Sequence, residues 1–398
     1  MLHSSFSGRS ARSMMTQVYD LAVIGSGIIG TCASFHGAKS GLKTIKIEQF
    51  KFGHAKGSSH GQSRIIRYAH ANTAWIPIMK ESYAQIDELE KKRGEKLWLN
   101  SGLLWVGGHE YVKNLSKTLS SAGCDHEVLT YSQIAARFPL FSYNDNWSGV
   151  FDPMGGTILA DKWMTAFHEE YLELGGKMEE ECEVKEIIKG EDVTTLKTNK
   201  GYIQAKKVIV AAGSWVNKLL PELNIKSENL ALSVCYWKLH SDKDLPLIEG
   251  DQMPVFIVDD QYDGGKHYFA IPSVEYEGAI KFGEHGGDLF EAGEEPSDHD
   301  KIFVERPRRH LVEHFPKIDS SAPAVVNHCK YTMSPDEKYI IDYLEKNKNI
   351  VICAMMSGTG FKVAPGLGKA LVSMVNGQPL PFDISIFKAD RFEKPFKG

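Results

Sequence analysis

The chain contains 398 residues, of which 42% are hydrophobic and 24% are charged, and its formal net charge is −5. A chain of this length and composition can bury a large core and is expected to divide into about two domains. It has no basic stripe with interleaved aromatic residues, which argues against nucleic acid as its main partner. No apolar stretch reaches the roughly 18 residues of a membrane span, so no membrane partner is expected.

Six cysteines are scattered along the chain without C-x-x-C or any other metal-type spacing. This usage is typical of reduced thiols in an intracellular protein that is not secreted, and it predicts no metal site. The six are Cys32, Cys124, Cys182, Cys235, Cys329 and Cys353.

The first 16 residues carry Arg9 and Arg12, five serines and no acid. This composition fits a mitochondrial presequence, and it fits equally a flexible leader before the first strand. The last residues do not form a peroxisomal signal of the Ser-Lys-Leu type. The compartment is therefore open at this point.

The first strand and turn carry the clearest motif. An apolar strand over residues 20–24 runs into Gly25-x-Gly27-x-x-Gly30, and a helical stretch follows to about Ser40. Gly25 makes the tight turn, Gly27 lets the backbone approach a pyrophosphate, and Gly30 lets helix and strand pack closely. The alternative is a generic tight turn between a strand and a helix.

A second predicted strand, residues 44–48, ends in Glu48. A carboxylate at this place would accept hydrogen bonds from ribose hydroxyls. One glycine motif alone is weak evidence, but this one follows a strand, opens a helix and is completed by an acid. The sequence therefore predicts a dinucleotide site.

Residues 51–68 are rich in Gly, Ser and His and then become basic, with Arg64 and Arg67 near the end. Small residues let the backbone approach a ligand, and arginines bind anions. The alternative is that both arginines are surface charges at strand positions.

Later segments repeat the strand–glycine–helix pattern of the first motif. The strand at 207–212 ends at Gly213, and the strand at 349–354 leads into a glycine-rich stretch at 357–368, followed by a helix from about Pro365 to Asn376. We expect these segments to resume the first sheet, and the glycines to allow close approach of a ligand. The two separated strand–glycine–helix units predict one discontinuous domain that holds one large cofactor.

Five motifs, in order and in register from about residue 17 to residue 392, closely resemble the monomeric sarcosine oxidase family, and most of all its peroxisomal members, which oxidise sarcosine or L-pipecolate. The resemblance implies FAD, oxidation of a secondary or N-methyl amino acid to an imine that hydrolyses, reduction of dioxygen to hydrogen peroxide, a peroxisomal location and a monomer. The motifs are Gly25-x-Gly27-x-x-Gly30 with Glu48, residues 57–67, residues 234–237, residues 328–332 with 335–337, and residues 357–362.

The resemblance also implies a fold. We expect an α/β protein with a discontinuous, Rossmann-like FAD-binding domain of the glutathione-reductase type and an antiparallel-sheet substrate domain. The expected divisions are a leader at 1–16, an FAD-binding domain at 17–80, 155–225 and 325–392, and a substrate-binding domain at 81–154 and 226–324.

In the family a cysteine in a Cys-x-Tyr-Thr segment carries the flavin covalently, and here that residue is Cys329. A thiolate is the natural nucleophile for a flavin methyl carbon, and His328 and Lys330 beside it would favour the thiolate. The alternative is an inert cysteine.

By family position Arg67 and Lys362 hold the substrate carboxylate, one as a fork and one as a point charge. Lys281 matches the lysine that promotes the dioxygen reaction, where a cation stabilises superoxide-like charge. A solvated strand lysine is the alternative for Lys281.

His285 and Tyr331 match residues that border the substrate amine, so that Lys281, His285 and Tyr331 form the implied catalytic group. An ordinary polar loop residue and an ordinary half-buried aromatic are the alternatives for the last two. The implied cofactor-binding residues are Gly25, Gly27, Gly30, Glu48, His60, Arg64, Gly213, Cys329, Gly358, Gly360 and Lys362.

The chain departs from the family beside the carboxylate site. Many relatives have histidine where this chain has Thr359, and Met355 and Met356 replace a more usual small–aromatic pair. These changes leave the preferred substrate open.

Three other functions also remain: a flavin dehydrogenase with a protein electron acceptor, which Lys281 disfavours, a catalytically silent FAD-binding protein, and an NAD-dependent enzyme suggested by the first motif alone.

Overall fold

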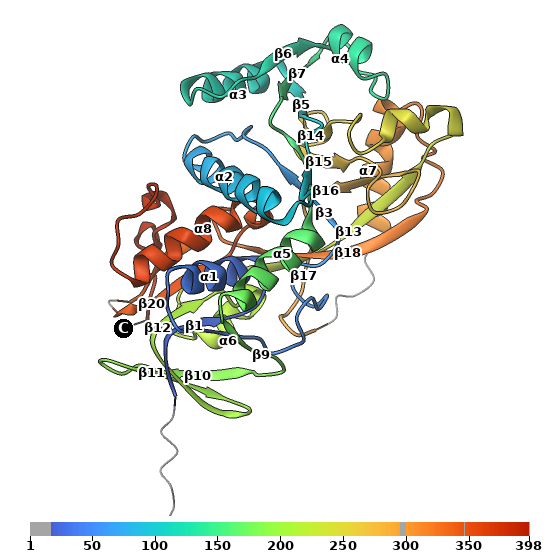
Figure 1. Ribbon diagram of the computed structural model, residues 1–398. Helices are drawn as coiled ribbons and strands as arrows, with labels where there is room; N and C mark the ends of the chain where they lie inside the picture. The colour runs from blue at the N-terminus through green and yellow to red at the C-terminus, as the bar shows by residue number, and fades with distance from the viewer. Residues whose placement is uncertain (1–16, 295–299, 346, 398) are drawn as a thin grey trace, which may run out of the picture.

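The computed structural model describes residues 17–294, 300–345 and 347–397, so the predicted leader lies outside the described residues. Two large sheets, one in each half of the molecule, are joined by long strands and a small third sheet (Figure 1). None of the described helices is long and apolar enough to cross a membrane.

The first sheet has eight strands and a parallel centre, in the order β20-β12-β1-β2-β9. A hairpin extends it from β12, and β19 pairs antiparallel with β20 at one side. Its strands are β1 (Val18–Ile24), β2 (Thr44–Ile47), β9 (Lys177–Glu179), β10 (Val184–Ile188), β11 (Thr194–Thr198), β12 (Gly201–Val210), β19 (Ile340–Leu344) and β20 (Asn347–Ala354).

Alternation along β1 shows why this sheet needs a layer on each face. Leu21 and Val23 enter one apolar core, and Ala22 and Ile24 enter another. Successive side chains of a strand point to opposite faces, so an uninterrupted apolar run requires cover on both sides.

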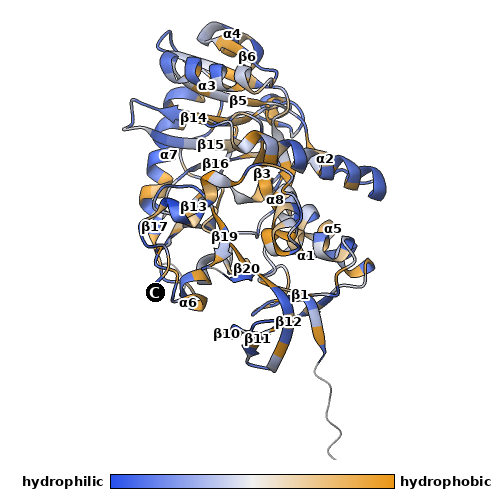
Figure 2. Cartoon of the chain, turned by 90° about the vertical axis from the view of Figure 1, so that its left-hand side faces the viewer, coloured by the Kyte–Doolittle hydropathy of each residue, from blue (hydrophilic) through white to orange (hydrophobic). Residues whose placement is uncertain are grey.

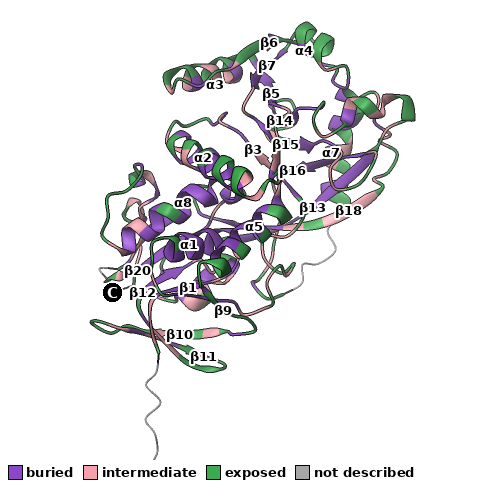
Figure 3. Ribbon diagram, viewed as in Figure 1, coloured by how far each residue is buried: buried purple, intermediate pink, exposed green. Residues whose placement is uncertain are grey.

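Two helices, α1 (Ile28–Lys39) and α8 (Gly360–Val375), cover one face, and α5 (Ala160–Glu173) packs on α1 while α2 (Trp75–Arg93) packs on α8. In Figure 3 α1 and α8 are mostly buried, while β10 is exposed or half-buried along its length. Hydrophilic residues follow the outer side of α2 in Figure 2. The short helix α6 (Val216–Leu219) packs on the opposite face.

Helix α8 begins at Gly360, five residues before the start that the sequence predicted, and Pro365 lies inside it. The glycines after Pro365 serve packing rather than ligand approach. A Cβ at Gly366 would lie 2.7 Å from the carbonyl oxygen of Ile78 in α2, and one at Gly368 would lie 2.7 Å from the carbonyl carbon of Cys32 in α1. Small residues therefore set how closely α8 approaches its neighbours.

The second sheet has nine strands in the order β17-β13-β16-β15-β14-β5-β7-β6, with β18 also paired to β13. It is antiparallel except for the parallel pair β14–β5. Its strands are β5 (Leu103–Gly108), β6 (Glu127–Thr130), β7 (Trp147–Asp152), β13 (Glu228–Lys238), β14 (Val255–Asp260), β15 (Lys266–Ile271), β16 (Ala279–Glu284), β17 (Asp288–Leu289) and β18 (Val325–Met333).

Helices α3 (His109–Ser121), α4 (Tyr131–Arg137) and α7 (Asp300–His314) pack on the second sheet. The third sheet, β3 (Ser63–Ile66), β8 (Gly156–Leu159) and β4 (Trp98–Leu99), leads from the first half to the second. The mixed α/β fold with two sheets agrees with the predicted fold class.

The predicted division of the chain into domains stays a prediction, and one strand, β18, does not follow it. Residues 325–333 form β18, which pairs along β13 of the nine-stranded sheet. The sequence division placed this segment in the cofactor domain. Since β18 also carries Cys329 and Tyr331, the border between the halves passes through the candidate site.

The close approach of α8 to α1 predicts the effect of Gly368→Ala. Alanine in place of glycine inside a helix normally stabilises by about 1 kcal/mol, but here the added methyl group meets the backbone of Cys32. We expect a loss of about 1 to 3 kcal/mol in the free energy of unfolding, measured by urea denaturation. Lys369→Ala, at the exposed neighbouring position, is the control and should change stability little. Stabilisation by Gly368→Ala would contradict this packing.

Candidate active site

A cavity of about 530 Å³ lies across the carboxyl ends of β1, β2, β12 and β20. This edge of a parallel sheet is where α/β proteins bind their ligands. The predicted site residues that line it are Gly25, Gly27, Glu48, His60, Arg64, Gly213, Tyr331, Gly358 and Gly360. The sequence motifs thus converge on one space.

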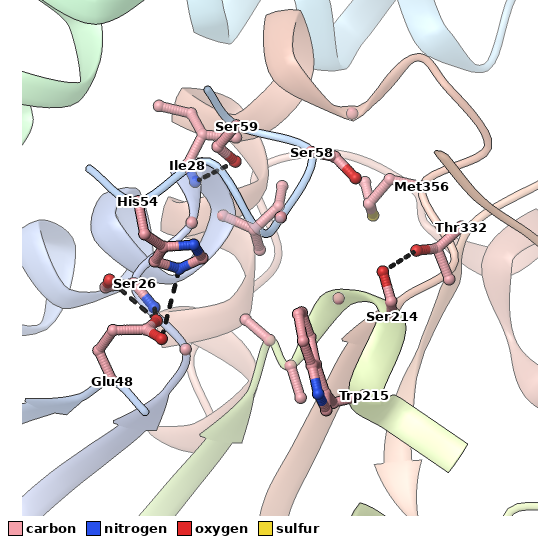
Figure 4. Close-up of a pocket in the computed structure, with 18 of the residues that line it drawn as sticks. Ser26, Ile28, Glu48, His54, Ser58, Ser59, Ser214, Trp215, Thr332 and Met356 are labelled. Atoms are coloured by element: carbon pink, nitrogen blue, oxygen red, sulfur yellow. Dashed lines mark hydrogen bonds and ion pairs between the residues drawn. The ribbon is translucent and has the colours of Figure 1, made fainter. Parts of the chain in front are cut away.

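At one end of the cavity the carboxylate of Glu48 faces the N-terminus of α1. The Oε2 atom of Glu48 accepts two hydrogen bonds from Ser26, one from its backbone amide at 2.8 Å and one from its hydroxyl at 3.0 Å. The Oε1 atom of Glu48 lies 3.4 Å from Nε2 of His54 (Figure 4). Burial raises the pKa of Glu48, but the hydrogen bonds from His54 and two backbone amides outweigh it and lower the pKa below its ordinary value. Glu48 is therefore a fixed anion.

The glycines of the first motif differ in their contacts. A Cβ at Gly30 would lie 2.0 Å from the carbonyl oxygen of Gly25, so Gly30 serves the packing of helix on strand and does not line the cavity. Gly27 is the N-cap of α1 without a side-chain cap, and the next amide, of Ile28, donates to Ser59 Oγ at 3.0 Å. The first turn of α1 therefore lines the cavity, with the amide of Ile28 held by Ser59 (Figure 4).

These features fit FAD. Backbone donors at a helix N-terminus suit a pyrophosphate, and a buried carboxylate at the end of the second strand suits ribose hydroxyls. At Gly213, on the opposite wall, a Cβ would meet no atom within 4 Å, so the space there is open for a cofactor. When bound, FAD supplies the two-electron acceptor.

The loop with His60 and Arg64 is held by its own side chains. The ring nitrogens of His60 lie 2.7 Å from the carbonyl oxygen of Gly57 and 2.9 Å from that of His328 in β18. Arg64 donates to the backbone oxygens of Ser58, His60 and Ser63. Both residues therefore fix the loop against β18 at the wall of the cavity.

Cys329 and Tyr331 lie on β18, two residues apart, and so share one face of the sheet. His328 and Lys330 lie on the other face of the strand, and the expectation that they act on the thiol stays a prediction. The cation that interacts with Cys329 is Lys281 of β16. Cys329 is half-buried and lies outside the residues that line the described cavity, next to Tyr331, which lines it.

Arg67 and Lys362 form a buried pair of cations. Their exposed fractions are 8% and 5%, and within the described residues neither makes an ion pair with a carboxylate. Nη1 of Arg67 has no hydrogen-bond partner there, while its guanidinium lies 4.6 Å from the ring centre of Trp105. Nζ of Lys362 donates to the carbonyl oxygen of Thr359 at 3.2 Å.

The pKa values follow from this burial. Burial lowers the pKa of Arg67 to about 10, and burial together with the charge of Arg67 lowers the pKa of Lys362 well below its ordinary value. Burial, His267 and the two cations lower the pKa of His285 to about 4, so its imidazole is neutral above pH 5. The His285 ring lies 5.1 Å from that of Tyr331.

His70 is a site residue that the sequence reasoning missed. It is buried, its Nε2 has no hydrogen-bond partner within the described residues, and Arg67 and Lys362 contribute, after burial, to a pKa well below the ordinary value. It therefore offers a neutral imidazole beside the two cations. Its position three residues after Arg67, at the end of the basic segment, was the available signal.

Thr359, which stands where the family resemblance expects histidine, belongs to a series of hydrogen bonds between three side chains. Its hydroxyl lies 2.8 Å from the hydroxyl of Tyr339, which accepts from Nε1 of Trp75 at 2.8 Å. Before it, Met355 and Ser357 have φ values of 53° and 44°, in the left-handed region that costs non-glycine residues energy. This strained turn lines the cavity.

Comparison with known proteins agrees with this site. A family model described as FAD dependent oxidoreductase matches residues 20–374. The chain is 40% identical to the "Putative sarcosine oxidase" of Caenorhabditis elegans, over 96% of this chain and 100% of that protein. It is 35% identical to the peroxisomal sarcosine oxidase of Mus musculus, over 95% and 97%.

Among solved structures, NikD, an unusual amino acid oxidase essential for nikkomycin biosynthesis, superposes with a TM-score of 0.79 at 18% identity, covering 94% of this chain and 98% of that one. This likeness concerns the fold. With the family match over nearly all of the described chain and the dinucleotide cavity at its strand ends, the chain belongs to the FAD-dependent oxidoreductase family.

Proposed function

We propose that this protein is a flavoprotein oxidase that oxidises a secondary or N-methyl amino acid, such as sarcosine or L-pipecolate, and reduces dioxygen to hydrogen peroxide. The observation that carries the proposal is the buried pair Arg67 and Lys362, which has no carboxylate at ion-pair distance in the described residues, since the buried Asp152 acts on Arg67 only through its charge. A buried positive pair is costly unless an anion joins it. The carboxylate of an amino acid is such an anion.

The neighbouring residues fit the rest of such a substrate. The rings of His285 and Tyr331 lie 5.1 Å apart, and the charges of Arg67 and Lys362 act on His285, whose neutral imidazole would add no positive charge near the amine. An uncharged amine can then lie toward the flavin. The imine that leaves would hydrolyse in water. Relatives named peroxisomal sarcosine oxidase support this substrate class and a peroxisomal location.

Electron transfer to dioxygen, rather than to a protein acceptor, is supported by Lys281. It is a buried lysine on the same face as Cys329, where a fixed cation would stabilise superoxide-like charge. The yield of hydrogen peroxide per turnover separates an oxidase from a dehydrogenase. Reduction of the flavin by any secondary amino acid would exclude a silent FAD-binding protein.

We further propose that Cys329 attaches the flavin and that the enzyme acts as a monomer. Three cysteines lie near the site, since Cys182 and Cys353 line the cavity and Cys329 lies next to Tyr331 in its wall. Burial raises the pKa of Cys353, in the cavity wall, to about 12, which disfavours its thiolate. Cys329 is half-buried and lies beside the cation Lys281.

Covalent attachment of the flavin to Cys329 predicts whether flavin stays with the protein after acid precipitation. We expect flavin to stay with the pellet in the wild type and in Cys353→Ala, and to wash out of Cys329→Ala, because only the last lacks the proposed nucleophile. Absorbance of pellet and supernatant measures this. Equal loss of flavin from all three proteins would remove the covalent link, and a colourless wild type would contradict the cofactor itself.

The cation pair predicts a pH dependence of carboxylate binding. Because the pKa of Lys362 is lowered, its ammonium loses a proton as the pH rises, and affinity for an anion falls with it. Methoxyacetate, which has the shape of sarcosine without an amine, is a suitable probe in a titration followed by flavin absorbance from pH 6 to 9.5.

In Lys362→Met we expect about tenfold to hundredfold weaker binding of methoxyacetate at pH 6, as for loss of a charged hydrogen bond, and a flatter pH profile. Lys369→Met, at an exposed lysine of the same helix, should keep the wild-type profile. Unchanged affinity in Lys362→Met would rule out this residue as a carboxylate ligand.

A further inference from the structure

We propose that Glu275 is a positioning residue that keeps Lys281 protonated and aimed at the site where dioxygen reacts. The inference rests on the proposed oxidase function and deepens it. Glu275 lies between β15 and β16, outside every sequence motif, and Lys281 lies on β16.

The contact between them is short and buried. Nζ of Lys281 lies 2.6 Å from Oε1 of Glu275, and the exposed fractions of the two side chains are 9% and 7%. The hydroxyl of Ser63, from β3, donates to the same carboxylate oxygen, and Nζ of Lys281 lies 3.3 Å from that hydroxyl oxygen. Three elements from different parts of the chain therefore meet at one carboxylate.

A fourth element fixes the carboxylate further. Tyr236 stands opposite Lys281 in the pairing of β13 with β16, and its hydroxyl is hydrogen-bonded to Glu275. The Tyr236 ring lies 5.7 Å from Nζ of Lys281, and Nδ2 of Asn327 donates to the Tyr236 hydroxyl at 3.4 Å. Glu275 thus has three partners, which leaves it little freedom to move away from the lysine.

The charges around Lys281 show why it needs this partner. Burial lowers its pKa, the charge of Arg64 lowers it further, and Glu275 and Cys329 raise it. If Cys329 is joined to the flavin its thiolate is consumed, so Glu275 becomes the remaining anion among the described groups that act on Lys281. Without Glu275, a buried lysine beside an arginine would give up its proton, and a neutral amine cannot stabilise superoxide-like charge.

The test compares flavin reoxidation in the wild type and Glu275→Gln as holoenzymes. Photoreduced enzyme is mixed with dioxygen between pH 6 and pH 10, and the rate is followed by absorbance. We expect the pH at which the rate falls to half to shift down by about one to three units, as for loss of an adjacent opposite charge. Anaerobic reduction of the flavin by sarcosine should change by less than about twofold, since the carboxylate site is untouched.

Two variants serve as controls. Glu275→Asp keeps the charge and should hold the profile closer to the wild type than Glu275→Gln does. Asp244→Asn breaks another ion pair of 2.6 Å, with Lys317, and should leave the profile unchanged. An unshifted profile in Glu275→Gln, with the wild type reacting normally, would overturn the role of Glu275 alone. A wild type whose flavin is not reduced by any secondary amino acid would overturn the proposed function instead.

A second measurement covers a failure of the single variant to fold. The melting temperature of Glu275→Gln should lie below that of the double variant Glu275→Gln/Lys281→Met, because the double variant leaves no uncompensated buried charge. A double variant that melts at or below the single variant would contradict the pairing. Neither outcome depends on turnover.

Discussion

The burial of two cations without a carboxylate at ion-pair distance in the described residues is the constraint on which the candidate site depends. Removing an ion from water costs several kcal/mol, so Arg67 and Lys362 must be held by the fold rather than by their mutual contact. Lys362 lies on α8, which packs closely against α1 and α2 at its glycines, and Arg67 stacks on Trp105 directly after β3. The buried carboxylate of Asp152 acts on Arg67 through its charge without an ion pair. An anion in direct contact with both cations would relieve the remaining charge.

Lys281 and Lys362 are buried to a similar degree, but their electrostatic surroundings differ. Burial lowers the pKa of Lys281, and Glu275, 2.6 Å away, counters that shift. Lys362 has no acid at such a distance in the described residues, and burial together with Arg67 lowers its pKa well below the ordinary value. Under the proposed function, a lysine with an anionic partner of its own suits the reaction with dioxygen. A lysine without one suits the binding of a carboxylate.

The glycine motif and Glu48 could be recognised in the sequence because their determinants are local. Gly25, Gly27 and Gly30 lie within six residues, and Glu48 ends the next strand, so pattern and spacing suffice. Contacts between residues of different elements were harder to predict from the sequence. Glu275 and Ser63 form a hydrogen bond although 212 positions separate them, and no motif in either segment indicates this contact.

One local error has an equally physical cause. The start of α8 was placed at Pro365 because proline favours a first helical turn and glycine suggests a loop. Packing on α1 and α2 overrides both preferences, since the close approach needs the glycines within the helix.

Under the proposed function, the hydrogen-bonded chain of Trp75, Tyr339 and Thr359 would influence the choice of substrate rather than the type of reaction. Its indole and hydroxyl groups are already hydrogen-bonded to one another, so they would act on a substrate through shape rather than through free donors. Arg67 and His70 keep polar atoms without a hydrogen-bond partner in the described residues. The charged groups would then select an amino acid as a class, and shape would distinguish its members, where one methylene is worth only about 1 to 3 kcal/mol. A site of this kind would accept several related amino acids, with preference set by the space beside Thr359.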